Sequence, residues 1–488
     1  MALPDPPPRP ERPTTPTCPL LPAMPHRPEP VALDGNALGL TESTIMGVAG
    51  TAPVFSIAAT SAALVAGVGV LAPASLLYCG LIMFGVTFAY MHLNRLDANA
   101  GASYAWVSSI FSRALGFLAG WALLVASAMF MVSGTIPAAT ATLALVHPAA
   151  MGNTAVVTLV AAGWLILVSA VILKGIKLTS YVQVTLTMLE LGILVVIVGT
   201  ALWKFSAAPA HAIHWSDFDP RAFSPHVFTL GALTAIFFYW GWDVTVNLNE
   251  ETRDGSWVAS VGSLLAMLII IALFILFMVV ALMALSDKEI QGANTNIMLA
   301  IADKLFPRPW NYMAVLAVML STLGTLETSI LQFTRTMFAQ SRDGMLHHRY
   351  AHLHPTWDTP WVATLAIAGF GLLLLFLASF IPTVNQIIQD SIDAIGFQAS
   401  FYYGLACLAC AWYVWKHQRG SWFHVVFFLL WPLCSGLFLW FIGLYSLPTF
   451  DAMTNTIAIG GVLIGLVPFW LNRRKAFPTA QAQPVNEL

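Results

Sequence analysis

Long apolar runs alternate with short polar stretches along almost the whole chain. A helix that crosses a bilayer needs about 20 apolar residues, and windows of this length predict twelve such helices. The predicted helices cover residues 44–70, 73–93, 103–146, 154–174, 180–203, 226–249, 257–285, 311–340, 361–381, 386–415, 422–445 and 454–472. The third, eighth and tenth are longer than a bilayer requires, so we expect them to tilt or to extend beyond it. The pattern predicts an all-α polytopic membrane protein with about 12 transmembrane helices.

Polar segments flank and interrupt this apolar region. Twelve of the first 30 residues are Pro, a composition that builds neither a helix nor a core, so we expect 1–43 to be a disordered cytoplasmic tail. It lacks the apolar stretch of a signal peptide. A transmembrane domain is expected at 44–473 and a second tail at 474–488. The polar segment 287–308 is expected to form a short surface helix outside the lipid.

Composition fits a surface that faces lipid. Apolar residues make up 58% of the 488-residue chain and charged residues only 9%, whereas soluble domains carry about 25% charged residues. Charged groups are costly in lipid, so the bilayer is the expected environment. The net charge of −2 gives no support for a nucleic-acid partner.

The distribution of Lys and Arg predicts the orientation. With the N-terminus in the cytoplasm, sixteen of the 21 basic residues fall in cytoplasmic segments and five fall outside. Cytoplasmic loops carry such an excess of positive charge. We therefore expect a multi-pass protein of the inner (plasma) membrane with both termini in the cytoplasm.

Two of the predicted helices contain breaks. The first has Gly50 and Pro53 in its middle, and the sixth has Gly241 within an aromatic stretch. Pro removes a backbone donor, Gly leaves helical angles easily, and the freed backbone groups need partners other than lipid. Pro53 and Gly241 lie 188 residues apart, as corresponding helices of two five-helix halves would. Such paired breaks point to a transporter site; the alternative is a pair of kinks packed on neighbouring helices.

Four motifs carry a family resemblance. They are FFYWGWDVTVNLNEETRD at 237–254, the small-residue stretch 99–106, the sequence 332–346 with its R-x-x-F-A-x-x-R-D-G-x-L pattern, and the stretch 398–413 around Tyr402-Tyr403-Gly404. Together they resemble the amino acid–polyamine–organocation superfamily of permeases. The first helix departs from that family, because Gly50 to Phe55 stands where Gly-x-Gly-Ile-Phe is common.

The resemblance implies a leucine-transporter-like fold of 5+5 inverted repeats with two C-terminal helices. The first repeat would cover about 44–203, the second about 226–415, and the extra helices 422–472. Uptake or exchange of an amino acid or a related amine would follow from this fold.

A substrate site is expected between the two breaks. Free amides at a half-helix N-terminus suit a substrate carboxylate, free carbonyls at the other break suit an ammonium group, and large aromatics can wall the pocket. The predicted substrate-binding residues are Gly50, Thr51, Ala52, Phe237, Phe238, Tyr239, Trp240, Gly241 and Trp242. Ordinary helix packing is the alternative role for the aromatic residues.

Glu190, Glu327 and Asp243 are the candidates for proton coupling. Each lies at membrane depth, where ionisable groups are costly and usually functional. In some members of the resembled family a lysine stands at the place that Glu190 occupies, near the sodium site of sodium-driven relatives. Glu190 offers a carboxyl group there, which can load and release a proton. The alternatives are a neutral Glu bonded to a neighbouring backbone, or one that reaches a water-filled vestibule.

Other residue patterns give weaker signals. Hydroxyls crowd 321–329 and could hold sodium, although bonds to neighbouring helices are the commoner role. We expect the four His residues in the loop 347–354 to face solvent, and Cys407 and Cys410 to be two small buried residues. We therefore expect no metal and no cofactor.

A secondary transporter, driven by protons or by exchange, is the favoured function. No H-E-x-x-H or G-x-S-x-G motif supports an enzyme, and no P-loop supports ATP-driven transport. A nutrient sensor on the same fold is a third possibility. The sequence leaves open which amino acid or amine is carried, whether sodium or protons drive transport, and the oligomeric state.

Overall fold

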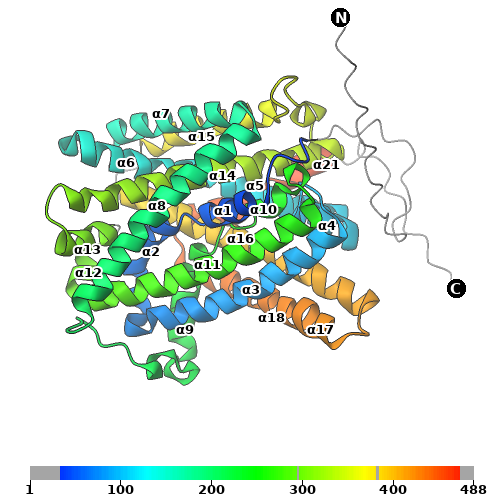
Figure 1. Ribbon diagram of the computed structural model, residues 1–488. Helices are drawn as coiled ribbons and strands as arrows, with labels where there is room; N and C mark the ends of the chain where they lie inside the picture. The colour runs from blue at the N-terminus through cyan, green and yellow to red at the C-terminus, as the bar shows by residue number, and fades with distance from the viewer. Residues whose placement is uncertain (1–32, 294–295, 381–383, 473–488) are drawn as a thin grey trace, which may run out of the picture.

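The computed structural model describes residues 33–293, 296–380 and 384–472 (Figure 1). All regular structure in these residues is helical, apart from one isolated bridge between Leu38 and Thr252. The α-helices are α1 Leu40–Gly50, α2 Pro53–Val68, α3 Ala72–Leu96, α4 Ser103–Ile110, α5 Arg113–Ser133, α6 Thr135–Val146, α7 Thr154–Leu173, α8 Ile176–Phe205, α9 Pro225–Phe238, α10 Val244–Asn247, α11 Gly255–Ala284, α12 Asp287–Ala293, α13 Ile297–Leu305, α14 Met313–Arg342, α15 Trp361–Ala378, α16 Val384–His417, α17 Trp422–His424, α18 Trp431–Ser446, α19 Ala452–Asn455, α20 Gly461–Leu463 and α21 Leu466–Asn472.

Ten segments among the described residues are long and apolar enough to cross a membrane. They confirm a multi-pass helical membrane protein. One of them, Leu40–Leu96, is 57 residues long and contains both the first and the second predicted helices. The predicted helix 226–249 is divided into α9 and α10 and is too short in either part to be counted. The count of twelve therefore stays a prediction.

Several boundaries differ from the sequence-based expectation. The predicted helix 103–146 is not continuous, because α4 ends at Ile110 and Ser112 caps the start of α5. The polar segment 287–308 forms two helices, α12 and α13, instead of one. Ordered structure also begins before residue 43: Leu33 is buried, and Asp34 forms an ion pair with Lys177 (3.0 Å). The last residues of the predicted tail 1–43 are thus part of the fold, while residues 1–32 lie outside the description.

The broken helices lie in the middle of the bundle. In Figure 1, α1 and α10 occupy the centre, with α14, α16 and α11 around them. α1 packs against α8, α10, α11 and α14, and α16 packs against α5 and α18. The last five residues of α1, from Met46 to Gly50, are all buried. This position keeps irregular backbone away from lipid, as a membrane protein requires.

α8 shows how the outer helices are arranged. Its buried face carries Gln183, Thr187 and Glu190, whereas Leu189 and Val195 on the other side are exposed. An apolar outer face and a polar inner face suit a helix that borders lipid. The α8 polar face is turned toward α14, which packs alongside it.

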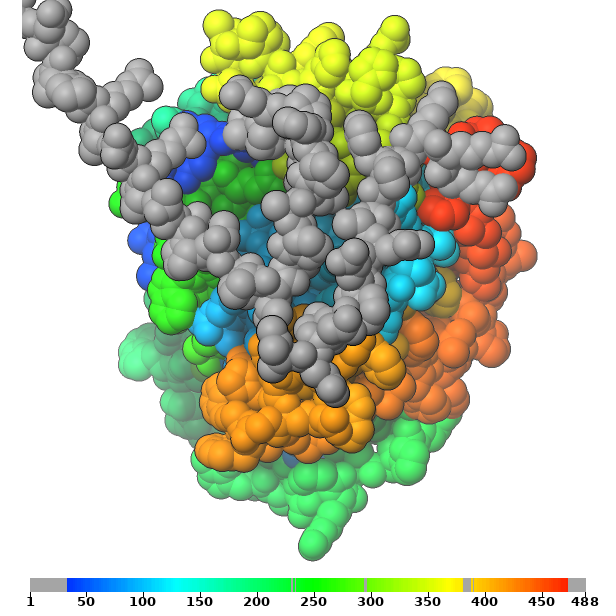
Figure 2. Space-filling view, turned by 90° about the vertical axis from the view of Figure 1, so that its right-hand side faces the viewer, coloured from blue at the N-terminus to red at the C-terminus, as the bar shows by residue number. Residues whose placement is uncertain are grey.

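The loops that were predicted to share the cytoplasmic side are found on one face. Figure 2 shows segments near residues 35, 105, 250, 350 and 420 gathered there. Contacts join them: the amide of Ala100 donates to Glu250, and the hydroxyl of Tyr104 donates to Asp343. The grouping agrees with the alternation expected from the charge pattern.

Candidate functional site

The first break lies directly between α1 and α2. Thr51 and Ala52 form the turn, and Ala52 has a φ of 45°, in the left-handed region that disfavours residues with a Cβ atom. The amide of Thr51 donates to the carbonyl of Val48 (3.2 Å), and the amide of Ala52 donates to the carbonyl of Ala49 (3.0 Å). These two amides were expected to be free for a ligand, but the turn itself uses them.

The amides that have no backbone acceptor lie further along, in the first turn of α2. Pro53 has no N–H to donate, and the next two amides bind side chains from other helices. Val54 donates to Oε1 of Glu190 on α8, and Phe55 donates to Oγ of Ser321 on α14, both at 3.2 Å. Helix dipole and open amides make this end of α2 favourable for negative charge. In this structure a carboxyl group of the protein occupies it.

The second break separates α9 from α10. Gly241 has a φ of 101°, which favours glycine. The amide of Trp240 donates to the carbonyl of Phe237 (3.1 Å), so this carbonyl is not free. The carbonyls of Phe238 and Tyr239 accept no hydrogen bond from the described residues. Two of the three carbonyls predicted to face an ammonium group are therefore open.

The two breaks meet at their glycines. A Cβ atom added to Gly50 would lie 2.2 Å from the carbonyl oxygen of Gly241, and one added to Gly241 would lie 2.2 Å from that of Gly50. Both positions therefore need glycine so that the two backbones can touch. We had expected glycine at these positions because the backbone would face a ligand. In the structure, glycine is needed because the two broken helices touch there.

Asp243 sits at the second break and is held by two tyrosines of α16. Tyr403 donates to Oδ1 (2.7 Å) and Tyr402 donates to Oδ2 (3.3 Å). The same hydroxyls accept hydrogen bonds from the broken segment: the indole of Trp240 donates to Tyr402 (3.0 Å), and the amide of Gly241 donates to Tyr403 (3.3 Å). The two tyrosines thus hold the irregular segment by the side chains of Trp240 and Asp243 and by the amide of Gly241.

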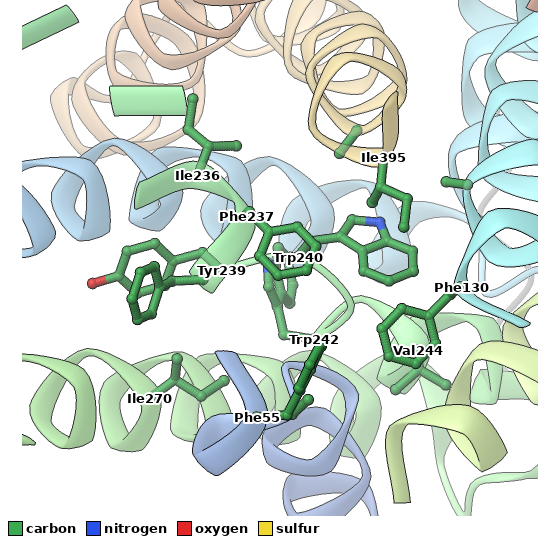
Figure 3. Close-up of a cluster of buried hydrophobic side chains, with 14 of the residues drawn as sticks. Phe55, Phe130, Ile236, Phe237, Tyr239, Trp240, Trp242, Val244, Ile270 and Ile395 are labelled. Atoms are coloured by element: carbon green, nitrogen blue, oxygen red, sulfur yellow. The ribbon is translucent and has the colours of Figure 1, made fainter. Parts of the chain in front are cut away.

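The aromatic side chains of the second break divide between two sides. Trp240 packs against Phe130 of α5, with ring centroids 5.5 Å apart, and Phe130 packs edge-on against Phe55 of α2 (6.4 Å). Tyr239 points away, as Figure 3 shows, and its hydroxyl donates to the carbonyl of Leu76 (2.7 Å). Trp240 therefore has the position of a wall between the breaks, and Tyr239 anchors α9 to α3.

The rings of Phe238, predicted to offer its carbonyl, and of Trp242, predicted to wall the pocket, also lie in different places. The ring of Phe238 packs against Phe274 of α11 (5.0 Å), away from the contact between the breaks. Trp242 is stacked on Tyr403 (6.0 Å) and is fully buried, and its indole nitrogen has no partner among the described residues. Phe130, which the sequence reading missed, completes the wall; nothing distinguishes it from its neighbours in an apolar run.

Glu327 lies apart from the breaks, between α14 and α8. With the amide of Gln183 oriented so that both its polar atoms are bonded, its nitrogen donates to Glu327 (3.2 Å) and its oxygen accepts from Thr187 (3.0 Å). Gln183 and Glu190 are two turns apart on the same face of α8. The structure therefore brings Glu190 to the first break and Glu327 to Gln183, two turns away on the same face of α8.

All three predicted coupling carboxyls are buried without a cationic partner. Glu190, Asp243 and Glu327 are at most 2% exposed. The ion pairs of the described residues include none of them. A buried carboxylate without a counter-charge is costly, so these three positions stay candidates for a functional role.

Two other carboxylates do form ion pairs, next to the second break. η5, Asn249–Glu251, follows α10, and its last residue pairs with Arg335 in two hydrogen bonds of 2.8 and 2.7 Å. Glu250 pairs with Arg342 in the same way, with both distances 2.8 Å. The signature motifs at 237–254 and 332–346 are therefore two halves of one structural contact, which the sequence alone did not join.

The remaining chemical expectations lie outside this centre. The described residues contain no group of three or more His, Cys, Asp or Glu that could hold a metal ion. Cys407 and Cys410 are buried free thiols. Of the crowded hydroxyls on α14, Thr322 and Thr328 bond to their own helix, while Thr325 donates to the carbonyl of Ala49 in α1. Thr325 thus ties α14 to the first break.

Comparison with known proteins gives a consistent result. The sequence model described as "Amino acid permease" matches residues 38–474. The chain is 24% identical to the serine/threonine exchanger SteT of Bacillus subtilis (strain 168) over 289 residues, 57% of this chain and 62% of the exchanger. It is 25% identical to the methylthioribose transporter of the same organism over 464 residues, 90% of this chain and 93% of that protein.

A third relative is an amine importer. The low-affinity putrescine importer PlaP of Escherichia coli (strain K12) is 23% identical over 376 residues, 75% of this chain and 78% of the importer. The chain thus spans less than two thirds of the exchanger and most of the other two relatives.

Proposed function

Because the chain belongs to the amino acid permease family, we propose that it carries an amino acid or a related amine across the inner membrane by alternating access, coupled to protons. The family and the relatives are permeases and transporters, so the protein is a transporter and not an enzyme. Twelve membrane crossings, 5+5 inverted repeats with two extra helices, and cytoplasmic termini belong to this proposal.

One observation carries the proposal of proton coupling: the buried carboxyl group of Glu190 binds the amide of Val54 at the start of a broken half-helix. Alternating access requires the half-helices to move relative to the helices around them. Movement of α2 away from α8 breaks this bond and opens Glu190 to water. The carboxyl group then releases its proton to the water on one side and takes up another from the water on the opposite side when the site opens there, which links proton movement to the access state.

The open acceptors around the second break support recognition of an amine. The carbonyls of Phe238 and Tyr239 are open, and Asp243, which already accepts from Tyr402 and Tyr403, lies within five residues of them. An ammonium group donates up to three hydrogen bonds. The α2 amides, by contrast, are bound to Glu190 and Ser321. A substrate carboxylate would have to displace these side chains, so the ammonium is the group for which acceptors are ready.

The alternative is exchange of one amino acid or amine for another. The serine/threonine exchanger among the relatives is named for that mode. Exchange needs no net proton movement, so it makes no use of a titrating Glu190. The two modes differ in whether a pH gradient drives accumulation.

Uptake into proteoliposomes tests the proposal. The purified chain is reconstituted and supplied with radiolabelled amino acids, putrescine and methylthioribose, with and without an inwardly directed proton gradient. We expect at least one of these compounds to accumulate, and to do so only with the gradient. Uptake that needs substrate inside the vesicle and ignores the gradient would establish exchange, and no uptake of any compound would count against the substrate class.

A further inference from the structure

A groove outside the proposed transport site lies between α3, α11 and the segment that begins with α17. It has a volume of about 650 Å³. α17 and the π-helical turn η9, Val425–Leu430, form its third wall. The residues that line it are apolar except for His92, Arg95 and His424. The groove therefore combines a long apolar surface with basic side chains, and no acidic side chain lines it.

Arg95 stands at the end of the groove with its hydrogen-bond donors open. It lies in the last turn of α3, is exposed, and has its guanidinium carbon 4.4 Å from the ring centre of Trp257. Among the described residues, no carboxylate lies within ion-pair distance of it. Stacking on an aromatic ring fixes the guanidinium plane and leaves its N–H groups free for an anion.

His92 lies one turn deeper. The residue is 7% exposed, its Nε2 atom is buried, and its ring lies within hydrogen-bonding reach of the Gln418 side chain. Its ring stacks on Phe428, with centroids 4.5 Å apart and planes at 22°, and lies 6.0 Å from the ring of His424. His92 therefore belongs to the inner wall of the groove, and Arg95 is the polar group that stays open.

The direction of the groove indicates what fills it. Phe88 lies seven residues before Arg95 on the same helix, about 10 Å deeper at 1.5 Å per residue. The basic end lies on the face that carries the predicted cytoplasmic loops, where lipid headgroups are found, and the apolar end lies at hydrocarbon depth. Basic pockets between helices on that side suit anionic headgroups, and an acyl chain suits the apolar part.

We propose that this groove binds an anionic phospholipid of the cytoplasmic leaflet, with its phosphate on Arg95 and an acyl chain along Phe88 and Val261. The lipid would fill the wedge between α3 and α11. α3 packs against α9 as well as α11, so a bound lipid would stabilise a helix that supports the second break.

Lipid binding by the full chain tests this directly. The protein is purified in a neutral detergent, and phosphatidylglycerol or phosphatidylcholine with the same acyl chains is added. Bound lipids are counted by native mass spectrometry, and the thermal unfolding midpoint is measured. We expect phosphatidylglycerol to bind more tightly and to raise the midpoint more than phosphatidylcholine.

Matched variants locate the effect. Arg95→Gln should weaken phosphatidylglycerol binding about fivefold to tenfold, as the loss of one basic contact near a membrane predicts, and Arg95→Lys should restore most of it. Arg253→Gln is the control, because it removes an equal charge from an exposed residue outside the groove. Equal binding of both lipids, an unchanged Arg95→Gln variant, or a dimer that excludes lipid from the groove would each overturn the proposal.

Discussion

Gly50 and Gly241 are the residues at which the two broken helices touch, and each excludes any side chain. We predict that Gly50→Ala or Gly241→Ala abolishes transport while the protein still inserts into the membrane, because a Cβ atom would lie 2.2 Å from the opposite carbonyl oxygen. Gly241→Ala also carries strain of about 1–3 kcal/mol from its positive φ. Substrate uptake and thermal unfolding of the purified variants measure both effects.

Gly199→Ala on α8 is the matched control. A Cβ atom there would meet nothing within 4 Å, so transport and stability should stay at the wild-type level. Full transport by Gly50→Ala or Gly241→Ala would show that the close backbone contact is not needed.

The roles of residues that change the local backbone could be predicted from the sequence. The roles that depend on contacts between distant segments could not. Pro53 and Gly241 indicate helix breaks because they alter the local backbone, and the structure contains both breaks. The partner of Glu190 lies 136 positions away in the chain, and no local pattern encodes such a contact. The tyrosines that hold Asp243 were visible as part of a motif, but their role depends on how α16 packs against the break.

At the scale of elements, η5 and α14 are joined by a buried ion pair. Arg335 and Glu251 are at most 1% exposed, and loss of one partner from such a pair leaves a buried charge, at a cost of about 3–5 kcal/mol. We predict that Glu251→Gln lowers the free energy of unfolding by an amount of this order. Denaturant titration or thermal unfolding in detergent measures it.

Two comparisons make this prediction specific. Glu250→Gln should cost less, because Arg342 and Glu250 are 20% and 17% exposed, so water can solvate the charge that is left unpaired. Replacing both buried partners, as in Arg335→Met with Glu251→Leu, should recover stability relative to Glu251→Gln. Equal costs for Glu251→Gln and Glu250→Gln would argue against a special role for the buried pair.

The long apolar helices were predictable, but their interruptions were only partly so. The prediction joined α4 to α5, although Ser112 and Arg113 interrupt the apolar pattern there and Ser112 caps the start of α5. The 57-residue run Leu40–Leu96 was divided into 44–70 and 73–93, close to the short helix η1, Gly69–Leu71, that separates α2 from α3. The start of ordered structure was placed too late because residues 37 and 38 are fixed by bonds to Glu251 from a distant segment.

At the scale of the whole molecule, the arrangement of loops tests the topology. We predict that Ser216→Cys, in the loop after α8, is labelled from outside intact cells, and that His348→Cys, after α14, is labelled only from the cytoplasm. Both positions are exposed, so access depends on sidedness. The background should lack Cys434, which is exposed. Labelling of position 348 by an impermeant reagent in sealed cells would reverse the orientation.

Coupling is also a property of the whole molecule, since it links one side chain to the movement of two halves. Glu190→Gln keeps the shape of the side chain but cannot release a proton. Glu289→Gln is the control, because Glu289 lies in α12, pairs with Lys304 (2.8 Å) and is far from both breaks along the chain. The control should transport like the wild type.

The most direct measurement compares accumulation and exchange by Glu190→Gln in proteoliposomes with an inwardly directed proton gradient. We predict that the variant exchanges labelled for unlabelled substrate at close to the wild-type rate but no longer concentrates substrate in response to the gradient. Accumulation by Glu190→Gln with the wild-type dependence on the pH gradient would contradict the proposal that this carboxyl group couples transport to protons.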